Sequence, residues 1–404
     1  MGLEILNILS SLIYYLCNLG SPRPPKQLPP LLHVELVMEI LSWLPVKSLV
    51  RFRSVSKSWN SLISDSHFVK LHLHRSTSRS NADFAHARFL TTVHVSSRAY
   101  ISSRSVTSLL ESHHSAERPY CVSEYNVVGA CNGLVCLSYG YENRNRFFRR
   151  VCFWNPATRS MSHDSPRLQT RSRRSRSYNY FGFGYDCSSD TYKVVNVRTE
   201  ETMANLYNKG DNRWWRIQVP PLPRLYLIGP AHYVSNAVNW LAILPIDYIY
   251  GKNGPELMDI DAYKIVSFDL GKQSNAQLSL PYCPRRRDEV PGFLPVIGIL
   301  RGYLCISDNS SKRGNVVVWQ MKEFGVHQSW TQLFSISASE KISWWPCFAM
   351  FMSDSGDALL LSVSTLSQGV LYTLRDNKLQ GTKIDNEIDD CYAENYIESL
   401  VSPW

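Results

Sequence analysis

Residues 32–65 read LHVELVMEILSWLPVKSLVRFRSVSKSWNSLISD and carry a strong helical pattern. Large apolar side chains recur every four residues, at Leu32, Leu36, Ile40 and Leu44. Because this spacing stacks side chains on one face of a helix, it predicts an amphipathic first helix. The polar residues that share its opposite face are Glu35, Glu39 and Ser42.

Two further short helices are expected after Pro45, which ends the first helix and suits the first turn of the next. The apolar positions of the second helix are Val46, Leu49 and Val50. Ser54 is the predicted N-cap of the third, whose apolar positions are Val55, Trp59, Leu62 and Ile63. Three helices this short cannot bury so much apolar surface among themselves. The surplus must meet either a partner or the neighbouring domain.

This stretch, continued through residues 67–72, closely resembles the F-box of plant proteins. In that family the apolar face binds a Skp-type adaptor, which joins the protein to a cullin scaffold. Two positions depart from the family pattern and bear on adaptor affinity: His33 replaces a proline, and Trp43 replaces a charged residue. Carried over by position, the resemblance assigns adaptor binding to Leu32, Leu36, Ile40, Leu41, Leu44, Pro45, Val46, Leu49, Val50, Val55 and Trp59.

The chain divides into four expected parts: an N-terminal extension with a Pro-rich linker (1–27), the F-box (28–74), a Ser/Arg-rich linker (75–115) and a β domain (116–404). The linker contains one candidate strand around residues 88–96. In the extension, residues 5–19 are apolar but shorter than the roughly 18–20 residues that span a bilayer. Glu4 precedes them, whereas a secretory signal begins with positive charge. We therefore predict no membrane partner.

Internal repetition indicates the fold of the β domain. The segment GLVCLS at 133–138 recurs as GYLCIS at 302–307, and Trp154 recurs as Trp319. Leu206-Tyr207 likewise recurs as Leu371-Tyr372 in the same order along the chain. Unit starts near 131, 180, 230, 300 and 347 imply a repeat on the order of 40–50 residues, the size of a four-stranded propeller blade. We expect about six blades, with the two ends of the domain sharing the closing blade.

The same half of the chain also resembles a known family, the F-box-associated domain of plant F-box proteins, which is related to kelch-like propellers. The resemblance is carried by CNGLVCL at 131–137, FWNPATR at 153–159 and FGFGYD at 181–186, among other segments. The expected fold class is therefore α+β multidomain, with a small three-helix F-box followed by an all-β domain that forms a propeller.

The sequence carries none of the common catalytic or metal-binding motifs. The chain has no G-x-S-x-G elbow, H-E-x-x-H pair, P-loop or EF-hand loop. The Gly182-Phe-Gly184 segment lacks the third glycine of a dinucleotide fingerprint, and we expect a β-turn there. The pairs His72/His74 and His113/His114 have no acidic or cysteine partners in a ligand pattern. These observations predict a protein with no enzymatic activity, no cofactor and no metal.

The ten cysteines are scattered, and no C-x-x-C pair occurs among them. Several lie in apolar runs, where cysteine acts as a small buried hydrophobe. Reduced, structural cysteines are typical of the cytoplasm or nucleus, and we expect the protein there.

A net charge of +9 raises the question of an acidic partner. Two arginine clusters lie in predicted loops between blades, and on one propeller face they would form a basic rim for an acidic or phosphorylated protein. We do not expect nucleic acid as the partner, although such a run can bind RNA phosphates. The clusters comprise Arg171, Arg173, Arg174, Arg176, Arg285, Arg286 and Arg287.

The leading hypothesis is a non-catalytic, substrate-recognition subunit of a Skp–cullin–F-box ubiquitin ligase. The F-box would dock on the adaptor, and the β domain would recruit a protein for ubiquitination and degradation. A second hypothesis is a carbohydrate- or RNA-binding propeller whose F-box no longer docks. A third is an oxidase-type enzyme, but no copper-ligand cluster of Tyr and His is apparent. The identity of the recruited protein does not follow from the sequence, because propeller loops vary while the blade core persists.

Overall fold

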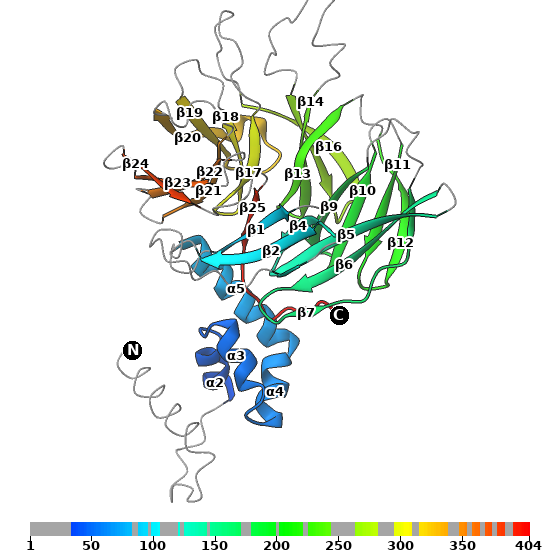
Figure 1. Cartoon of the computed structure of the whole chain (residues 1–404), viewed down its shortest axis with the longest axis vertical. Coiled ribbons are helices and arrows are strands. Elements are labelled where there is room, and N and C mark those ends of the chain that lie inside the picture. Colours follow the sequence, from blue (N-terminus) through cyan, green and yellow to red (C-terminus); the bar gives the residue numbers. More distant parts are fainter. Residues whose placement is uncertain are drawn as a thin grey trace, which may run out of the picture.

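The structure is a computed structural model of the 404-residue chain. It describes residues 34–82, 88–95, 98–105, 120–121, 125–143, 146–170, 179–198, 202–220, 225–243, 263–281, 295–308, 315–337, 347–353, 358–363, 368–373, 378–383 and 391–404. A helical module lies against one end of a β-propeller, and the last helix of the module continues toward the blades (Figure 1). Leu32 and His33 and both arginine clusters fall outside the described residues.

Four helices form the module: α2 (Val34–Leu41), α3 (Val46–Phe52), α4 (Lys57–Ser64) and α5 (Ser66–Ala82). The first three confirm the predicted helices, but the predicted cap of the third is wrong. Ser56, rather than Ser54, accepts the hydrogen bond from the Trp59 main-chain nitrogen at 3.2 Å. Ser54 instead donates to the Arg51 carbonyl at the end of α3, since a hydroxyl can bond the preceding turn.

The core of the module is small. Its fully buried members are Leu41, Val46, Leu49, Ile63 and Phe68, together with Leu400 from the far end of the chain. Ser42, which we expected on the solvent face, is also buried. Its hydroxyl donates to the Glu39 carbonyl at 2.7 Å and lies under α5.

The β domain consists of six sheets with antiparallel pairing, each with four strands in its main ladder. The first three sheets follow chain order. Their strands are β4 (Asn126–Cys131), β5 (Leu134–Asn143), β6 (Arg146–Asn155) and β7 (Ser160–Met161), with β8 (Leu168–Thr170) also on β6; β9 (Tyr180–Asp186), β10 (Thr191–Val197), β11 (Met203–Asn208) and β12 (Arg213–Gln218); and β13 (Tyr226–Val234), β14 (Ala237–Ile243), β15 (Tyr263–Asp269) and β16 (Ser274–Ser279).

The remaining sheets complete the ring. Their strands are β17 (Val296–Leu300), β18 (Tyr303–Asp308), β19 (Asn315–Met321) and β20 (Trp330–Ser337), with the 3-10 helix η2 (His327–Ser329) between the last two; β21 (Cys347–Met352), β22 (Ala358–Val363), β23 (Gln368–Thr373) and β24 (Lys378–Lys383); and β25 (Cys391–Tyr396), β1 (Arg88–Val95), β2 (Arg98–Ser105) and β3 (Tyr120–Cys121). The inner strands β4, β9, β13, β17, β21 and β25 contact one another in sequence and back to β4. The described strands therefore form a closed six-bladed propeller, which confirms the predicted fold.

The closing blade joins the two ends of the domain, as expected. Strand β25 pairs with β1, with Tyr396 opposite Arg88 and Cys391 opposite Val93. This pairing corrects one predicted boundary, because β1 and β2 lie within residues 75–115, which we expected to be a linker. Strand β1 confirms the candidate strand around residues 88–96, but its partner β25 lies about three hundred residues away in the chain, so the local sequence did not show that this strand belongs to a blade.

The repeated sequence landmarks occupy equivalent places. Gly133 and Gly302 both lie in two-residue turns that join the first and second strands of a blade, and both have a φ of 79°. The preceding residues, Asn132 and Arg301, also have positive φ, as a type I′ hairpin turn requires. Trp154 and Trp319 each lie on the third strand of their blades.

The turn expected at Gly182-Phe-Gly184 is wrong, because both glycines lie inside strand β9. A Cβ on Gly182 would lie 2.7 Å from Cζ2 of Trp240 and closer still to Val238, both on the next blade. These glycines therefore allow the aromatic side chains of one blade to press on the backbone of its neighbour.

A buried ion pair lies beside this contact between blades. The Lys193 ammonium on β10 lies 2.6 Å from the Asp186 carboxylate, and their side chains are 5% and 1% exposed. Lys193 also donates to the Leu270 carbonyl of the next blade at 3.1 Å. Burial by itself raises the pKa of Asp186, but Lys193 and the hydroxyls of Ser189 and Ser188 outweigh it and hold that pKa well below its usual range.

Candidate functional site: the outer face of the helical module and its joint with the propeller

The outer face of α2 carries exposed apolar side chains. Leu36 is 51% exposed and Val34 is 55% exposed, while Ile40, one turn after Leu36, is half-buried. Trp43, just beyond the end of the helix, is 50% exposed. Large apolar groups gathered in this way on a small module are typical of a binding surface.

The predicted adaptor-binding residues separate into three groups. Leu36, Pro45 and Val55 are exposed and available to a partner. A second group is partly buried: Ile40, Leu44, Val50 and Trp59. Of these, Leu44, Val50 and Trp59 pack against the core of the module. The third group is fully buried in the core beneath this surface and consists of Leu41, Val46 and Leu49.

Helix α5 holds the end of α2 in place. The Arg75 guanidinium lies 2.5 Å from the Glu39 carboxylate and donates to the Glu39 carbonyl at 2.9 Å. It also donates to the hydroxyl of Ser42, and its Cζ lies 4.8 Å from the centroid of the Trp43 ring. The hydrogen bond from Arg75 lowers the pKa of Glu39. Sequence reasoning missed Arg75 because it lies in the segment we expected to be a linker.

His72, which we considered and rejected as a metal ligand, has a structural contact in this region. It is buried, and its Nε2 lies 2.9 Å from the Leu44 carbonyl oxygen at the α2–α3 corner. Nothing in the spacing of His72 and His74 indicated this contact. Among the residues that the structure describes, no group of three or more His, Cys, Asp or Glu side chains is placed to hold a metal ion.

The last eight residues, 397–404, join the propeller to the helical module. The Asn155 side-chain amide at the end of β6 donates to the carbonyls of Ser399 at 3.0 Å and Val401 at 2.8 Å. Ser399 donates from its hydroxyl to the Asn132 carbonyl at 2.8 Å. Between these anchors, Leu400 enters the core of the module and is only 3% exposed. The end of the β domain therefore supplies a fully buried residue of the helical module's core.

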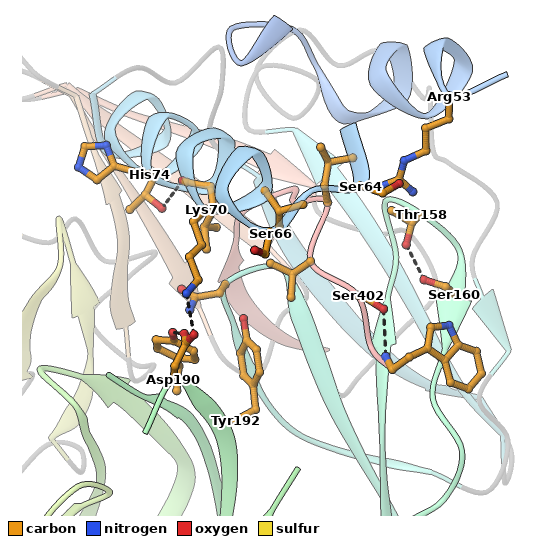
Figure 2. Close-up of a pocket in the computed structure, with 18 of the residues that line it drawn as sticks. Arg53, Ser64, Ser66, Lys70, His74, Thr158, Ser160, Asp190, Tyr192 and Ser402 are labelled. Carbon is orange, nitrogen blue, oxygen red and sulfur yellow. Dashed lines mark hydrogen bonds and ion pairs between the residues drawn. The ribbon is translucent and has the colours of Figure 1, made fainter. Parts of the chain in front are cut away.

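A cavity of about 970 Å³ lies beside this joint, between α5 and the turns of the propeller. In Figure 2, Lys70 reaches from α5 to Asp190 in the β9–β10 turn, at 2.7 Å. Thr158 and Ser160 bond each other at 2.6 Å, and the Ser402 hydroxyl accepts from the Trp404 main-chain nitrogen at 3.2 Å. Because these polar groups pair with one another, we interpret the cavity as part of the domain joint.

The position of α5 distinguishes the two ends of the propeller. Asp190 and the Asn132-Gly133 turn lie on the α5 side of the propeller, in the walls of cavities that Lys70 and Thr77 also line. Tyr180, at the other end of the β9–β10 hairpin, pairs with Val197 and lies on the side away from α5. The cluster predicted at 171–176 precedes Tyr180 in sequence, but its own placement, like that of residues 285–287, lies outside the described residues.

The described cysteines are buried for the most part. Cys131, Cys136, Cys152 and Cys305 are buried, and Cys121 and Cys187 are exposed. Burial raises the pKa of Cys152 and of Cys305 to about 12, so these thiols stay protonated and unreactive at neutral pH. Within the described ranges, no helix combines the length and apolar character that crossing a membrane requires.

Comparison with known proteins places these two parts in named families. Residues 30–71 match the F-box domain, and residues 86–403 match the F-box associated beta propeller domain. F-box/kelch-repeat protein At3g23880 of Arabidopsis thaliana is 28% identical over 390 residues, covering 92% of this chain and 96% of that protein. F-box protein CPR1 of the same plant is 25% identical over 396 residues, covering 91% of this chain and 88% of that protein. TolB from Acinetobacter baumannii aligns with 82% of this chain and 72% of its own, at 8% identity and a TM-score of 0.42.

The two family matches agree in order and position with the helical module and the six-bladed domain. The second match alone spans most of the chain. Relatives from a plant align over nearly their whole length. This chain therefore belongs to the plant F-box proteins that carry a C-terminal F-box associated β-propeller domain.

Proposed function

We propose that this protein is a substrate-recognition subunit of a Skp–cullin–F-box ubiquitin ligase. The F-box binds a Skp-type adaptor and, through it, a cullin, while the propeller recruits the protein to be ubiquitinated. The observation that carries this proposal is the exposed apolar face of α2, with Leu36 half exposed to solvent on a module whose own core is already filled. Membership of the F-box family supports a Skp-type adaptor as the partner.

The proposed role needs no catalytic group in this chain. The protein acts by holding the adaptor and the recruited protein at a fixed distance and orientation. The hydrogen bonds at residues 397–404 keep the F-box in place relative to the propeller. Since α5 occupies one end of the propeller, we place the recruited protein at the other end, beyond the strand ends at Tyr180 and Val296. The basic rim predicted at 171–176 and 285–287 remains a proposal for that end. We propose the cytoplasm and nucleus as the sites of action.

Adaptor binding is tested with purified full-length protein and a recombinant plant Skp-type adaptor. We expect wild-type protein to bind, and Leu36→Asp to raise the Kd by about 30-fold or more, because a carboxylate cannot enter an apolar interface unpaired. Leu36 is a better probe than Leu44, which packs against the core and would disturb folding. Val326→Asp is the matched control, since Val326 is a 40% exposed apolar residue on the propeller.

Recruitment is tested by proximity labelling in plant cells with and without a proteasome inhibitor. Proteins labelled by the wild type should accumulate with the inhibitor. The same proteins should be labelled by Leu36→Asp but should lose their ubiquitination, because that variant keeps the propeller and loses the adaptor. Failure of the wild-type protein to bind any Skp-type adaptor would contradict the proposal.

A further inference from the structure

We infer that Trp43 is an additional anchor that the F-box presents to the Skp-type adaptor, and that Arg75 of α5 positions it. This inference rests on the proposed function and deepens it. Trp43 lies two residues beyond the end of α2 and is 50% exposed.

Helical spacing places Trp43 on the proposed docking face. Leu36, Ile40 and Trp43 follow one another at i, i+4 and i+7, which brings them to the same side of a helix. Hydrogen bonds from Ser42 to the Met38 carbonyl and from Trp43 to the Ile40 carbonyl carry the helical path through this position. The indole therefore extends the exposed stripe by about one turn beyond Ile40.

The indole is held in one orientation. Arg75 lies over the ring at 4.8 Å, and the indole Nε1 donates to Glu39 Oε1 at 3.4 Å. Arg75 in turn is held by Glu39 at 2.5 Å, so the three side chains form one cluster. A side chain ordered before binding loses less conformational entropy when a partner arrives, which favours its use as an anchor.

Half of the Trp43 surface nevertheless faces solvent, and the indole does not belong to the core of the module. Tryptophan and arginine are enriched among the residues that dominate binding energy at protein interfaces. The neighbouring exposed apolar group on the same stripe is Leu36. A partner that covers Leu36 and extends one turn toward the helix end covers Trp43 as well, and for the proposed function that partner is the adaptor.

A second tryptophan provides a closely matched control. Trp215 on β12 is 47% exposed, its indole donates to Asp211 at 2.9 Å, and Arg213 lies 5.2 Å from its ring centroid. Its surroundings thus repeat those of Trp43, but it lies on the outer edge of a propeller blade. If the loss of any exposed tryptophan that contacts a carboxylate and an arginine weakened adaptor binding, replacing Trp43 and replacing Trp215 would have the same effect.

The experiment measures the Kd of full-length protein for the recombinant Skp-type adaptor by calorimetry, with thermal unfolding as a check on folding. We expect Trp43→Ala to raise the Kd by about 30-fold, Trp43→Phe by about threefold or less, and Trp215→Ala not at all. Equal Kd values for Trp43→Ala and wild type would overturn the inference and leave the proposed function intact. A wild-type protein that fails to bind would overturn both.

The positioning role of Arg75 is tested by a double-mutant cycle. Arg75→Met removes the guanidinium, and the lost contact with the ring corresponds to a rise in Kd of about two- to fivefold. In the Trp43→Ala background the same change should have no effect, because no indole is left to position. An equal effect of Arg75→Met in both backgrounds would show a general structural role and overturn this part of the inference. Arg75→Lys repeats the cycle should the methionine variant unfold.

Discussion

The side-chain amide of Asn155 donates a hydrogen bond to the main-chain oxygen of Ser399 at 3.0 Å, across 244 residues of sequence. Asn155 ends the third strand of a blade, and Ser399 follows the strand that closes the propeller. This bond holds the tail where Leu400 can enter the F-box core. The position of the F-box relative to the propeller therefore depends on a few polar groups at the joint.

Replacing Asn155 should destabilise the joint. The residue is fully buried, and its amide also reaches Val401 at 2.8 Å. Asn155→Ala leaves the buried Ser399 carbonyl and the partly buried Val401 carbonyl without this donor. We expect a loss of about 2–4 kcal/mol in the free energy of unfolding, measured in urea. Asn275→Ala is the control, since its amide makes one bond to the Pro220 carbonyl at an exposed site. Similar losses in both variants would contradict the role given to Asn155.

Truncating Leu400 should loosen the F-box more than the propeller. Leu400→Ala leaves a cavity among Leu41, Ile63 and Phe68, and deletions of this kind cost about 2–5 kcal/mol. Hydrogen exchange should accelerate in α2–α4, while the amides of β9 and β10 keep their protection. Leu36→Ala removes the same atoms from an exposed position and should leave exchange in both domains unchanged. Unchanged exchange in α2–α4 of Leu400→Ala would show that the F-box core is complete without the tail.

Breaking the Asp186–Lys193 pair should be strongly destabilising. Lys193→Met leaves the carboxylate buried without its ammonium partner, and we expect a cost of about 3–5 kcal/mol in thermal or urea unfolding. The double variant Asp186→Asn/Lys193→Met removes both charges and should recover part of that loss. If the double variant is no more stable than Lys193→Met, the unpaired charge of Asp186 is not the cause of the lost stability.

His232 should make stability depend on pH. Burial lowers the pKa of His232 to about 4, whereas a histidine in the unfolded chain titrates near about 6.5. Between these values the unfolded state binds a proton that the folded state does not, so stability falls as the pH falls. The expected loss is about 1.4 kcal/mol per pH unit, or about 3 kcal/mol over the window, and it levels off below about pH 4.

The measurement for His232 is the pH slope of the unfolding free energy, compared between wild type and His232→Gln. The glutamine variant cannot titrate, so its slope between about pH 6.5 and 4 should be shallower, whatever its absolute stability. Parallel slopes for the two proteins would assign the pH dependence to other groups.

Local sequence patterns predicted much of this structure. The four-residue spacing of Leu36, Ile40 and Leu44 predicted the first helix, because a helix brings such positions to one face. Recurrent landmarks such as Gly133 and Gly302 predicted the blades, because each blade needs the same turn at the same place. Both features depend on residues near one another in the chain, which is why they can be read directly.

Patterns of this kind could not reveal contacts between distant segments. Helix α5 has little amphipathic character, and its second half, from residue 75 onward, was expected to be a polar linker. Arg75 and His72 nevertheless use their polar atoms to hold the α2–α3 corner. The pairing of β1 with β25 likewise brings together the two ends of the β domain. Such contacts depend on where the fold places each segment rather than on its own periodicity.

Short-range spacing and ordered motifs were enough to predict the helical module, the repeated β architecture and the family. The packing of the whole chain settled which apolar residues of the module remain exposed. It buried Leu41, Val46 and Leu49, left Leu36 and Trp43 at the surface, and filled the core with Leu400. The physical reason is that an apolar side chain is buried or exposed according to what the rest of the chain packs against it.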